Sequence, residues 1–403
     1  MRTARPVCEL LVVGGGVIGL SLAWRAREEG LSVTVLERGA TGGGTSRVAA
    51  GMLAPVAEVE FGEAGRRALE LGLRAAAMWP GYAAALEQRA GVEVGLMRTG
   101  TLVLARDGDG ARELERQLAL RRALGLQAEQ LRPGQARERE PALAPTVRAA
   151  LLAPEDHSLD PRLLLGALRR ACEASGVRLR EGATVARVEC QEGPAGGRVR
   201  GVTLAGASRE FLPAACVALA AGPWSDKLGG VPGAGRVPVR PVKGQLLRLR
   251  DPAGPGLLRG VVRFEGGYVV PRADGRYVLG ATVEERGYEL TATAGAIYEL
   301  LRDAHEVLPG VSELVVEELC VGLRPGTPDN VPAIGAAATR GLLWATGHHR
   351  NGILLAPLTA ELLVDVLAGR PRDPLLGLCD PTRFAPAGER GAAREPVAAA
   401  VPS

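Results

Sequence analysis

Short apolar runs recur along the chain, and segments with a helical spacing of apolar positions follow several of them. Residues 9–13 (ELLVV) predict a short buried strand, and residues 17–29 have the periodicity of a helix. Residues 31–36 (LSVTVL) predict a second buried strand. Together these three segments indicate a β-α-β unit of about 30 residues.

The rest of the pattern mixes further α/β segments with strand-rich ones. The turn residues 273–275 separate two predicted strands, 268–272 and 276–281, which is typical of a hairpin. The other expected elements are helices at 63–90, 111–140, 161–175 and 353–367, and strands at 98–105, 177–180, 184–189, 216–221, 315–321 and 341–346. This order favours an α/β fold with one nucleotide-binding domain assembled from separate pieces and a second, β-rich domain built from the insertions.

The expected domain boundaries follow from that order. The nucleotide-binding domain comprises residues 1–92, 150–226 and 322–378, and the second domain comprises residues 93–149 and 227–321. Residues 379–403 form a C-terminal tail. We expect it to be largely disordered from about residue 386, because its last stretch consists mainly of Ala, Pro, Gly, Arg and Glu.

Composition excludes several classes of protein. The 403 residues are 46% apolar and 23% charged, which are ordinary values for a globular protein, and the net charge is only +4. We therefore expect neither a nucleic-acid partner nor binding to an acidic membrane surface. The apolar stretch from Leu10 to Trp24 is interrupted by glycines, which argues against a signal peptide. No run of 18 uncharged apolar residues predicts a membrane span.

The six cysteines are scattered along the chain and form no C-x-x-C pair. This spacing predicts neither a disulfide framework nor a metal site, and it favours a reducing, cytoplasmic location.

The first motif with chemical meaning is Gly14-x-Gly16-x-x-Gly19, between the first predicted strand and the first predicted helix. Gly14 permits a tight turn, Gly16 lets the backbone approach a pyrophosphate, and Gly19 lets helix and strand pack closely. Glu37 ends the second strand, where a carboxylate can accept the ribose hydroxyls of an adenosine. The alternative is a glycine-rich turn beside an exposed glutamate.

A second polar loop distinguishes between dinucleotides. Residues 41–47 (TGGGTSR) directly follow Glu37-Arg38-Gly39, where an NAD enzyme normally continues into a helix and a strand. Such a loop offers additional N–H and O–H donors to a longer cofactor, which favours FAD over NAD. Loops of this composition are also common linkers, so the composition alone leaves both interpretations open.

Four segments together make the chain recognisable: VVGGGVIGLSLAW (12–24), GGGTSRVAAGMLAP (42–55), CVGLRPGTPDNVPAIG (320–335) and GHHRNGILLAPLTAELL (347–363). The chain resembles the D-amino-acid oxidase-like FAD oxidoreductases and, within them, the glycine oxidases of thiamine biosynthesis. The resemblance extends from about residue 7 to residue 380. It implies a discontinuous Rossmann-like FAD-binding domain with an inserted substrate domain, which consists of an antiparallel sheet and helices.

The resemblance also implies a set of cofactor contacts. Residues 348–354 would line the pyrimidine ring of the flavin, where the N-terminus of the following helix stabilises negative charge. Val185 would contact the adenine. The full set of expected FAD contacts is Gly14, Gly16, Val17, Ile18, Gly19, Glu37, Arg38, Thr45, Ser46, Ala50, Gly51, Met52, Val185, Gly222, His348, His349, Arg350, Asn351, Gly352, Ile353 and Leu354. We expect noncovalent FAD.

Four residues are expected at the substrate. In the family, the arginine that matches Arg324 binds the substrate carboxylate in a two-pronged pair, which suits guanidinium geometry. Arg350 could touch substrate, flavin or backbone carbonyls. Tyr268 would border the active site and Met52 the flavin side of the pocket. From the residues alone, an exposed arginine, a strand tyrosine and a methionine that fills the core are the alternatives.

The implied activity is oxidation of glycine, and of sarcosine and small D-amino acids, to an imine by hydride transfer to flavin N5. O2 would be reduced to H2O2, and the imine would supply thiazole assembly. No catalytic acid or base stands out. The alternatives are a sarcosine or N-methyl amino acid oxidase, a D-amino acid dehydrogenase, and a flavoprotein without catalytic activity. The resemblance further implies a homo-oligomer, a tetramer or a dimer, and possible coupling to thiazole-synthesis enzymes.

Overall fold

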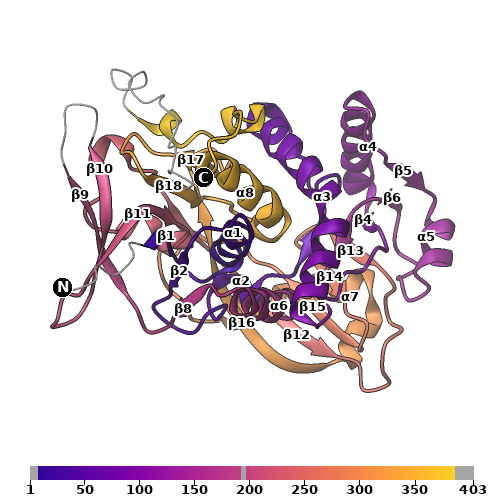
Figure 1. Ribbon diagram of the computed structural model, residues 1–403. Helices are drawn as coiled ribbons and strands as arrows, with labels where there is room; N and C mark the ends of the chain where they lie inside the picture. The colour runs from indigo at the N-terminus through magenta and orange to yellow at the C-terminus, as the bar shows by residue number, and fades with distance from the viewer. Residues whose placement is uncertain (1–7, 192–196, 386–403) are drawn as a thin grey trace, which may run out of the picture.

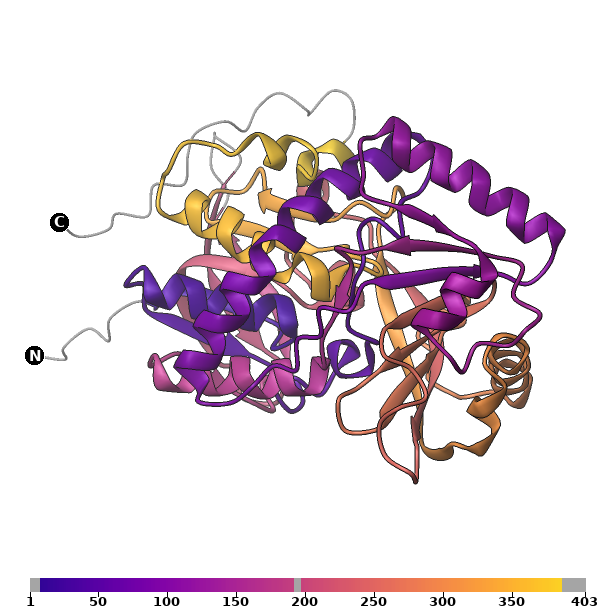
Figure 2. The same ribbon diagram turned by 90° about the vertical axis from the view of Figure 1, so that its right-hand side faces the viewer.

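The computed structural model describes residues 8–191 and 197–385. Two eight-stranded sheets organise these residues (Figure 1). The first sheet and its helices contain both the start and the end of the described chain. The second sheet lies beside it, and the long helix α3 (Gly62–Ala90) runs along the molecule toward the second sheet (Figure 2).

The first sheet has the parallel core that the β-α-β pattern predicts. Its strand order is β17 (Ala333–Ala336), β18 (Leu342–Thr346), β11 (Phe211–Leu219), β1 (Cys8–Val13), β2 (Val33–Leu36) and β8 (Arg178–Arg180), with β10 (Arg198–Leu204) and β9 (Val185–Gln191) branching from β11. The neighbours from β18 to β8 pair in parallel, and only β17 is antiparallel in this path. All four residues of β2 are buried, as continuous apolar parallel strands require.

Helices from distant parts of the chain pack together on this sheet. They are α1 (Val17–Glu28), α3, α6 (Pro161–Ala174) and α8 (Gly352–Leu367). Trp79 and Tyr82 of α3 are fully or nearly fully buried, and the ring of Tyr82 meets those of Trp24 and Trp79 edge-on at 5.3 and 5.4 Å. The indole N–H of Trp79 donates to the carbonyl of Leu354 at 2.9 Å, which ties α3 to the start of α8.

The second sheet is mostly antiparallel. Its order is β16 (Val315–Gly326), β12 (Arg240–Arg250), β15 (Arg276–Gly280), β14 (Gly267–Pro271), β13 (Val261–Phe264), β4 (Thr101–Ala105), β6 (Ala149–Ala153) and β5 (Glu129–Leu131). Helices α4 (Gly108–Ala123), α5 (Pro133–Arg139) and α7 (Ala294–Val307) accompany it. The predicted hairpin is present as β14 and β15, which pair antiparallel.

Two element predictions were wrong. The single helix expected over 111–140 is instead α4, β5 and α5, because Gly125 adopts a φ of +69° and Pro133 begins a new helix. Strand β16 continues to Gly326, so Arg324 lies within the strand and not after it.

The expected division into domains stays a prediction. The boundaries proposed at 149/150 and 321/322 fall inside β6 and β16, and both strands pair along their length in the second sheet. At the C-terminal end, Cys379 is buried in the core beneath the first sheet. The disorder expected from about residue 386 concerns residues outside the described ones.

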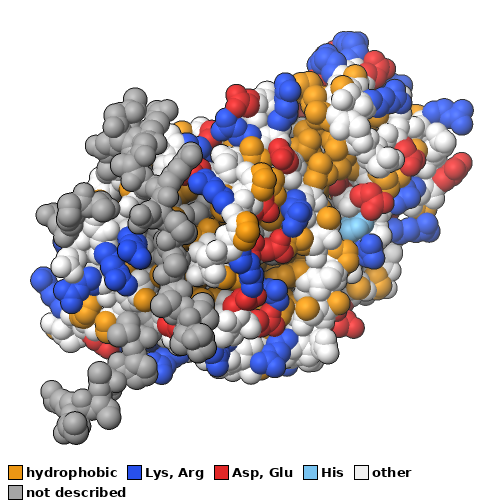
Figure 3. Space-filling view, turned by 45° about the horizontal axis from the view of Figure 1, so that its top comes forward, with side chains coloured by type: hydrophobic (Ala, Val, Ile, Leu, Met, Phe, Trp, Pro, Cys, Tyr) orange, Lys and Arg blue, Asp and Glu red, His pale blue; other side chains and the backbone are white. Residues whose placement is uncertain are grey.

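None of the helices in the described ranges is long and apolar enough to cross a membrane. Basic and acidic side chains are interspersed on the face shown in Figure 3.

Candidate functional site

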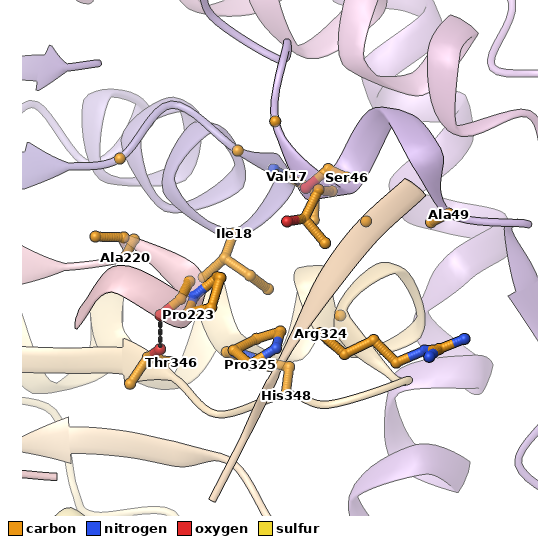
Figure 4. A pocket seen from close by; sticks show the side chains of 18 of the residues that line it. Val17, Ile18, Ser46, Ala49, Ala220, Pro223, Arg324, Pro325, Thr346 and His348 are labelled. Carbon is orange, nitrogen blue, oxygen red and sulfur yellow. Dashed lines mark hydrogen bonds between the residues drawn. The ribbon is translucent and has the colours of Figure 1, made fainter. Parts of the chain in front are cut away.

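The main cavity lies where the two sheets meet, and its volume is ≈ 420 Å³. Its wall combines the C-terminal ends of β1, β2 and β18 with residues of β12, β14 and β16. In Figure 4, Val17 and Ser46 lie on one side of it, and Arg324 extends away from Ala220 and Thr346. A cavity at the carboxyl edge of a parallel sheet, of a size within the usual range of about 300–1,000 Å³, is a typical ligand site.

Twenty of the predicted site residues line this cavity: Gly14, Gly16, Val17, Ile18, Glu37, Arg38, Thr45, Ser46, Ala50, Gly51, Met52, Val185, Gly222, Tyr268, Arg324, His348, His349, Arg350, Gly352 and Ile353. Three others lie elsewhere. Gly19 packs beneath the turn, and Asn351 and Leu354 line a smaller neighbouring cavity. The structure therefore does not place Asn351 and Leu354 at the main cavity, because the first turn of α8 directs them to its other side.

Glycine is required where the first strand turns into α1. Gly14 has a φ of +110°, and a Cβ added there would lie 2.4 Å from the carbonyl oxygen of Ala220. A Cβ on Gly19 would lie 1.9 Å from the carbonyl oxygen of Gly14. Gly16 is different, since the nearest atom to its added Cβ is Ser46 Oγ at 3.2 Å. Glycine at this position therefore keeps the cavity open and is not needed for packing.

Glu37 lies at the end of β2 and accepts two backbone hydrogen bonds. Its Oε2 accepts from the Gly15 N–H at 2.8 Å, and its Oε1 accepts from the Gly39 N–H at 3.0 Å. These bonds hold the carboxylate beside the glycine-rich turn. Each carboxylate oxygen has further lone pairs, so the group can still accept hydrogen bonds from a ribose.

Cation–π and aromatic contacts close the same end of the cavity. The Arg38 guanidinium lies 3.7 Å from the centre of the Trp224 ring, and the Tyr288 ring lies 6.0 Å from that of Trp224. The Tyr288 hydroxyl donates to the carbonyl of Pro223 at 2.8 Å. Tyr288 lies in the segment that follows β15, so this segment packs behind Pro223 and Trp224, which line the cavity.

The loop that contains α2 (Thr45–Val48) joins the two sheets at the middle of the cavity. Ser46 Oγ accepts from the Val17 N–H at 3.1 Å, and Thr45 Oγ1 donates to the Leu323 carbonyl at 3.0 Å. Two buried arginines donate to carbonyls of the same loop: Arg248 of β12 to Arg47 at 2.8 Å, and Arg272, in the turn after β14, to Ala50 at 2.5 Å. These bonds fix the loop between the two layers.

The turn before α8 brings two histidines to the cavity. His348 Nε2 lies 2.9 Å from Thr359 Oγ1, and burial lowers the pKa of His348 to about 3. His349 has a φ of +47°, and its pKa also falls to about 3, first through burial and then through the charges of Arg350 and Arg324. Both imidazoles are therefore neutral at physiological pH, and the N-terminus of α8 supplies the positive potential here.

Arg324 is held across the opposite end of the cavity. Its Nη1 donates to the carbonyl of Thr282 at 3.0 Å and to that of Lys243 at 3.4 Å. Burial lowers the pKa of Arg324, and the charge of Arg350 lowers it further. The close approach needs Gly244, since a Cβ there would lie 2.5 Å from Arg324 Nη1. The exposed arginine considered from the sequence is thus excluded.

Tyr268, Glu58 and Arg350 complete this end. Burial raises the pKa of the Tyr268 hydroxyl, and the positive charge of Arg324 opposes that rise. The carboxylate of Glu58 is the main cause of the raised pKa of Arg350. Glu58 is itself paired with Arg263 at 3.4 Å. The end is therefore lined by two guanidinium groups, a phenol and one carboxylate, a set that complements a small zwitterion.

Residues 9–366 match the family described as FAD dependent oxidoreductase. The chain belongs to this family. It is 35% identical over 381 residues to the bifunctional protein ThiO/ThiG of Synechocystis sp., which covers 93% of this chain and 54% of that protein. It is 33% identical over 361 residues to a glycine oxidase of Geobacillus kaustophilus, covering 89% of this chain and 92% of that protein.

Solved structures give the same assignment. The crystal structure of glycine oxidase from Geobacillus kaustophilus has a TM-score of 0.85 and 31% sequence identity, with 94% of this chain and 99% of that one covered. An iminodiacetate oxidase from Chelativorans sp. BNC1 has a TM-score of 0.80 at 26% identity, with 93% and 99% covered. The chain spans about half the length of the bifunctional relatives, which are covered at 54% and 55%. The predicted family, fold class and FAD cofactor are confirmed.

The cavity of this FAD-dependent oxidoreductase fits its cofactor. The open face of Gly16 and the N-terminus of α1 suit the pyrophosphate, Glu37 suits the adenosine ribose, and the N-terminus of α8 suits an electron-rich ring. Val185 lines the cavity near Glu37 and Arg38, where the adenine is expected. That no covalent bond holds FAD stays a prediction. Cys320 does not line the cavity, and its Sγ lies 3.9 Å from Arg162 Nη2.

Sequence reasoning missed three members of the site. Glu58 and Gly244 line the substrate end of the cavity, and Trp224 lines the cofactor end, where it stacks on Arg38. An acid six residues after Met52 is a weak signal on its own, because nothing in the spacing shows that the loop folds back over Arg350. Gly244 stands in the PVKGQLLRL segment, where a glycine inside a strand indicates a close approach by another group.

Proposed function

We propose that the protein oxidises glycine, and also sarcosine and small D-amino acids, to the corresponding imines. The observation that carries this proposal is Arg324, which lies half-buried in the wall of the cavity and is fixed by two backbone carbonyls at 3.0 and 3.4 Å. A guanidinium fixed in this way presents its remaining N–H groups as a planar fork, and a carboxylate matches that fork. The glycine oxidase relatives support the choice of substrate.

The substrate carboxylate pairs with Arg324, and Tyr268 borders the same part of the cavity. The negative charge of Glu58 favours binding of the substrate's ammonium group on the other side. Hydride can leave the α-carbon only when the amine is neutral, so the ammonium loses one proton to solvent before the transfer. With both ends held, the α-carbon is oriented toward the flavin, and positioning supplies much of the rate enhancement. The chemistry that bound FAD supplies is acceptance of the α-hydrogen as hydride at N5 and return of the electrons to O2, giving H2O2.

No side chain of this site needs to act as a catalytic acid or base. The pKa of each of the two histidines is lowered to about 3, so neither accepts a proton from an ammonium at neutral pH. The small size of the substrate follows from the packing of Met52, Tyr268 and Ala281 around the same space. These residues exclude water from the reacting bond when the cofactor and substrate fill the cavity.

The product imine would be used in thiazole assembly. The relatives named bifunctional protein ThiO/ThiG support this role, since this chain matches about half of each. A role in amino acid catabolism is the alternative. The homo-oligomeric state, a tetramer or a dimer, and the cytoplasmic location remain predictions.

A sarcosine or N-methyl amino acid oxidase is the main alternative. The similarity to an iminodiacetate oxidase supports this alternative, because iminodiacetate is also an N-substituted glycine. The resemblance implies that sarcosine oxidases use a lysine near flavin N5. The corresponding strand here, β15 with the sequence RYVLG, contains no lysine. This favours the glycine oxidase branch. A D-amino acid dehydrogenase would differ only in the electron acceptor.

The test is anaerobic reduction of the purified holoenzyme by a panel of amino acids. Glycine, sarcosine and D-alanine should bleach the flavin absorbance, L-alanine should not, and admission of air should give H2O2. Flavin that stays oxidised with every amino acid would contradict the proposal and favour a non-catalytic flavoprotein. Bleaching without H2O2 on reoxidation would indicate a dehydrogenase.

A further inference from the structure

A second arginine reaches the substrate end of the cavity besides Arg324. Arg350 lines the cavity, and its charge lowers the pKa of Arg324, so the two guanidinium groups lie within each other's electrostatic reach. One arginine suffices for a substrate with one carboxylate. The second therefore needs an explanation of its own.

Arg350 is occupied by an acid from the adjacent loop. Its Nη2 lies 3.1 Å from Glu60 Oε1, and the Glu60 side chain is 68% exposed while that of Arg350 is 31% exposed. A pair exposed to this extent contributes little to stability, because water competes for both partners. A ligand carboxylate that offers both oxygens to the guanidinium can displace such a partner.

The two acids near Arg350 are held differently. Glu58 is paired with Arg263 at 3.4 Å, and its side chain is only 14% exposed. The backbone of Glu60 is fixed, since a Cβ on Gly65 would lie 2.2 Å from its carbonyl oxygen, but its carboxylate makes its contact at the surface. Glu60 can therefore swing away without any change in the backbone, whereas Glu58 stays in place.

There is space beside Arg350 for another group. A smaller cavity of ≈ 50 Å³ adjoins the main one, and the two share Glu58, His349 and Arg350. One water molecule needs on the order of 10–15 Å³, so a space of ≈ 50 Å³ is several times larger and can hold the three heavy atoms of a carboxylate. Two further acids line the smaller cavity, Glu58, which is paired with Arg263, and Asp329, which is paired with Arg383 at 3.0 Å. The junction of the two cavities thus combines room, a guanidinium, a weakly held competing acid in Glu60, and two acids whose charges other arginines compensate.

We propose that Arg350 forms a second anion subsite, which binds a second carboxylate on the substrate and which Glu60 occupies when the substrate has only one. The inference rests on the proposed function, with Arg324 binding the first carboxylate. It extends the substrate class to N-substituted glycines and other small amino acids that contain a second carboxylate. Glu60 is then a specificity-determining residue, because it competes with that group.

The experiment compares two N-substituted glycines, N-carboxymethylglycine (iminodiacetate) and N-methylglycine (sarcosine). They differ by one carboxylate. For each we measure kcat/KM of the holoenzyme, and Kd from the change in flavin absorbance under anaerobic conditions. The variants are Glu60→Gln, Arg350→Met and Arg350→Lys. The matched control is Glu63→Gln, which removes one negative charge from the start of α3, where Glu63 pairs with Arg67.

Glu60→Gln should raise the preference for the dicarboxylate by about twofold to fivefold, the range of an exposed ion pair, and added salt should reduce that gain. Arg350→Met should lower the preference by about tenfold or more, and Arg350→Lys should restore part of it. Glu63→Gln should leave it unchanged. Glycine turnover in the same preparations tests the proposed function separately. The ratio of the Kd values of the two compounds tests the second subsite even if turnover is absent.

The subsite is overturned if Glu60→Gln behaves like Glu63→Gln. It is equally overturned if Arg350→Met retains the wild-type preference, or if both compounds lose affinity in parallel, which would assign Arg350 to the flavin or the fold.

Discussion

The two ends of the main cavity are built in different ways. The dinucleotide end consists of backbone groups at the ends of neighbouring parallel strands, with Gly14 and Gly16 keeping space open and one acid, Glu37, fixed by two N–H groups. The substrate end consists of charged side chains from segments far apart in the sequence, such as Glu58, Arg324 and Arg350. The first end depends on the absence of side chains and the second on their presence. Substitutions that impair FAD binding at the first end should therefore differ from those that impair substrate binding at the second.

The largest effect is expected at the dinucleotide end. Gly16→Val should yield folded protein with less than about a tenth of the wild-type FAD, because its side chain occupies the pyrophosphate position while meeting only Ser46 Oγ in the protein. The ratio of flavin to protein absorbance after purification measures this. Gly166→Val is the control, since Gly166 lies exposed on α6 outside the cavity and an added Cβ there meets no described atom within 4 Å. Wild-type flavin content in Gly16→Val would contradict the assignment.

Next in size is the loss of Arg324. Arg324→Ala should retain FAD but lower kcat/KM for glycine by roughly two to four orders of magnitude, since removing one partner of a buried pair costs about 3–5 kcal/mol. Arg324→Lys should recover only part of the loss, because an ammonium cannot match both carboxylate oxygens. A simple amine without a carboxylate should be affected much less. Equal losses for glycine and that amine would indicate general damage.

A smaller effect should come from the residue behind Arg324. Gly244→Ala places a methyl group 2.5 Å from Nη1 of Arg324 in its present position, so the guanidinium must shift. A shift of about 1 Å in a group that positions the substrate can lower the rate by up to about a hundredfold. We expect kcat/KM for glycine to fall by about tenfold to a hundredfold with FAD content unchanged. A Gly244→Ala enzyme with wild-type kinetics would show that Arg324 has another productive position.

The smallest effect concerns stability against acid. The pKa of His348 is lowered to about 3 in the folded protein against about 6.5 when unfolded, so the unfolded chain binds more protons between these values. The contribution of the neutral His348 to the free energy of unfolding is present above pH 6.5 and is lost as the pH falls toward 3. Between pH 7 and 5 the loss is on the order of 2 kcal/mol. His348→Gln should remove that part of the pH dependence of urea unfolding, and an unchanged slope would argue against a neutral buried imidazole.

Sequence reasoning identified the two ends to different degrees. The glycine spacing and Glu37 are local signals, because turn, helix and strand follow each other directly. Gly14, Gly16 and Glu37 line the main cavity, and Gly19 packs beneath the turn. The resemblance indicated Arg324 and Arg350, but no local pattern showed that Glu58 would line the same cavity. Asn351 and Leu354 were placed at the flavin, and the helical turn directs them to the smaller cavity. Contacts between distant segments depend on packing that spacing does not encode.

The fold shows the same contrast. Continuous apolar runs predicted the parallel strands β1, β2 and β18, because strands buried on both faces need them. The prediction of one helix over 111–140 was wrong. Charged residues with helical spacing occur on both sides of the turn at Gly125 and of the short edge strand β5, so the pattern gave no sign of the interruption. Edge strands are half exposed, so their sequences carry little of the apolar signal.

The most direct test of the account separates binding of the carboxylate from turnover. Glycolate carries a carboxylate but no amine, and its binding to the oxidised holoenzyme can be followed through the flavin absorbance. We predict that Arg324→Ala retains wild-type FAD content and weakens glycolate binding by about tenfold or more, the value of a charge-assisted pair. The same Kd for glycolate in wild type and Arg324→Ala would contradict the assignment of the carboxylate to Arg324 and, with it, the separation of the two ends.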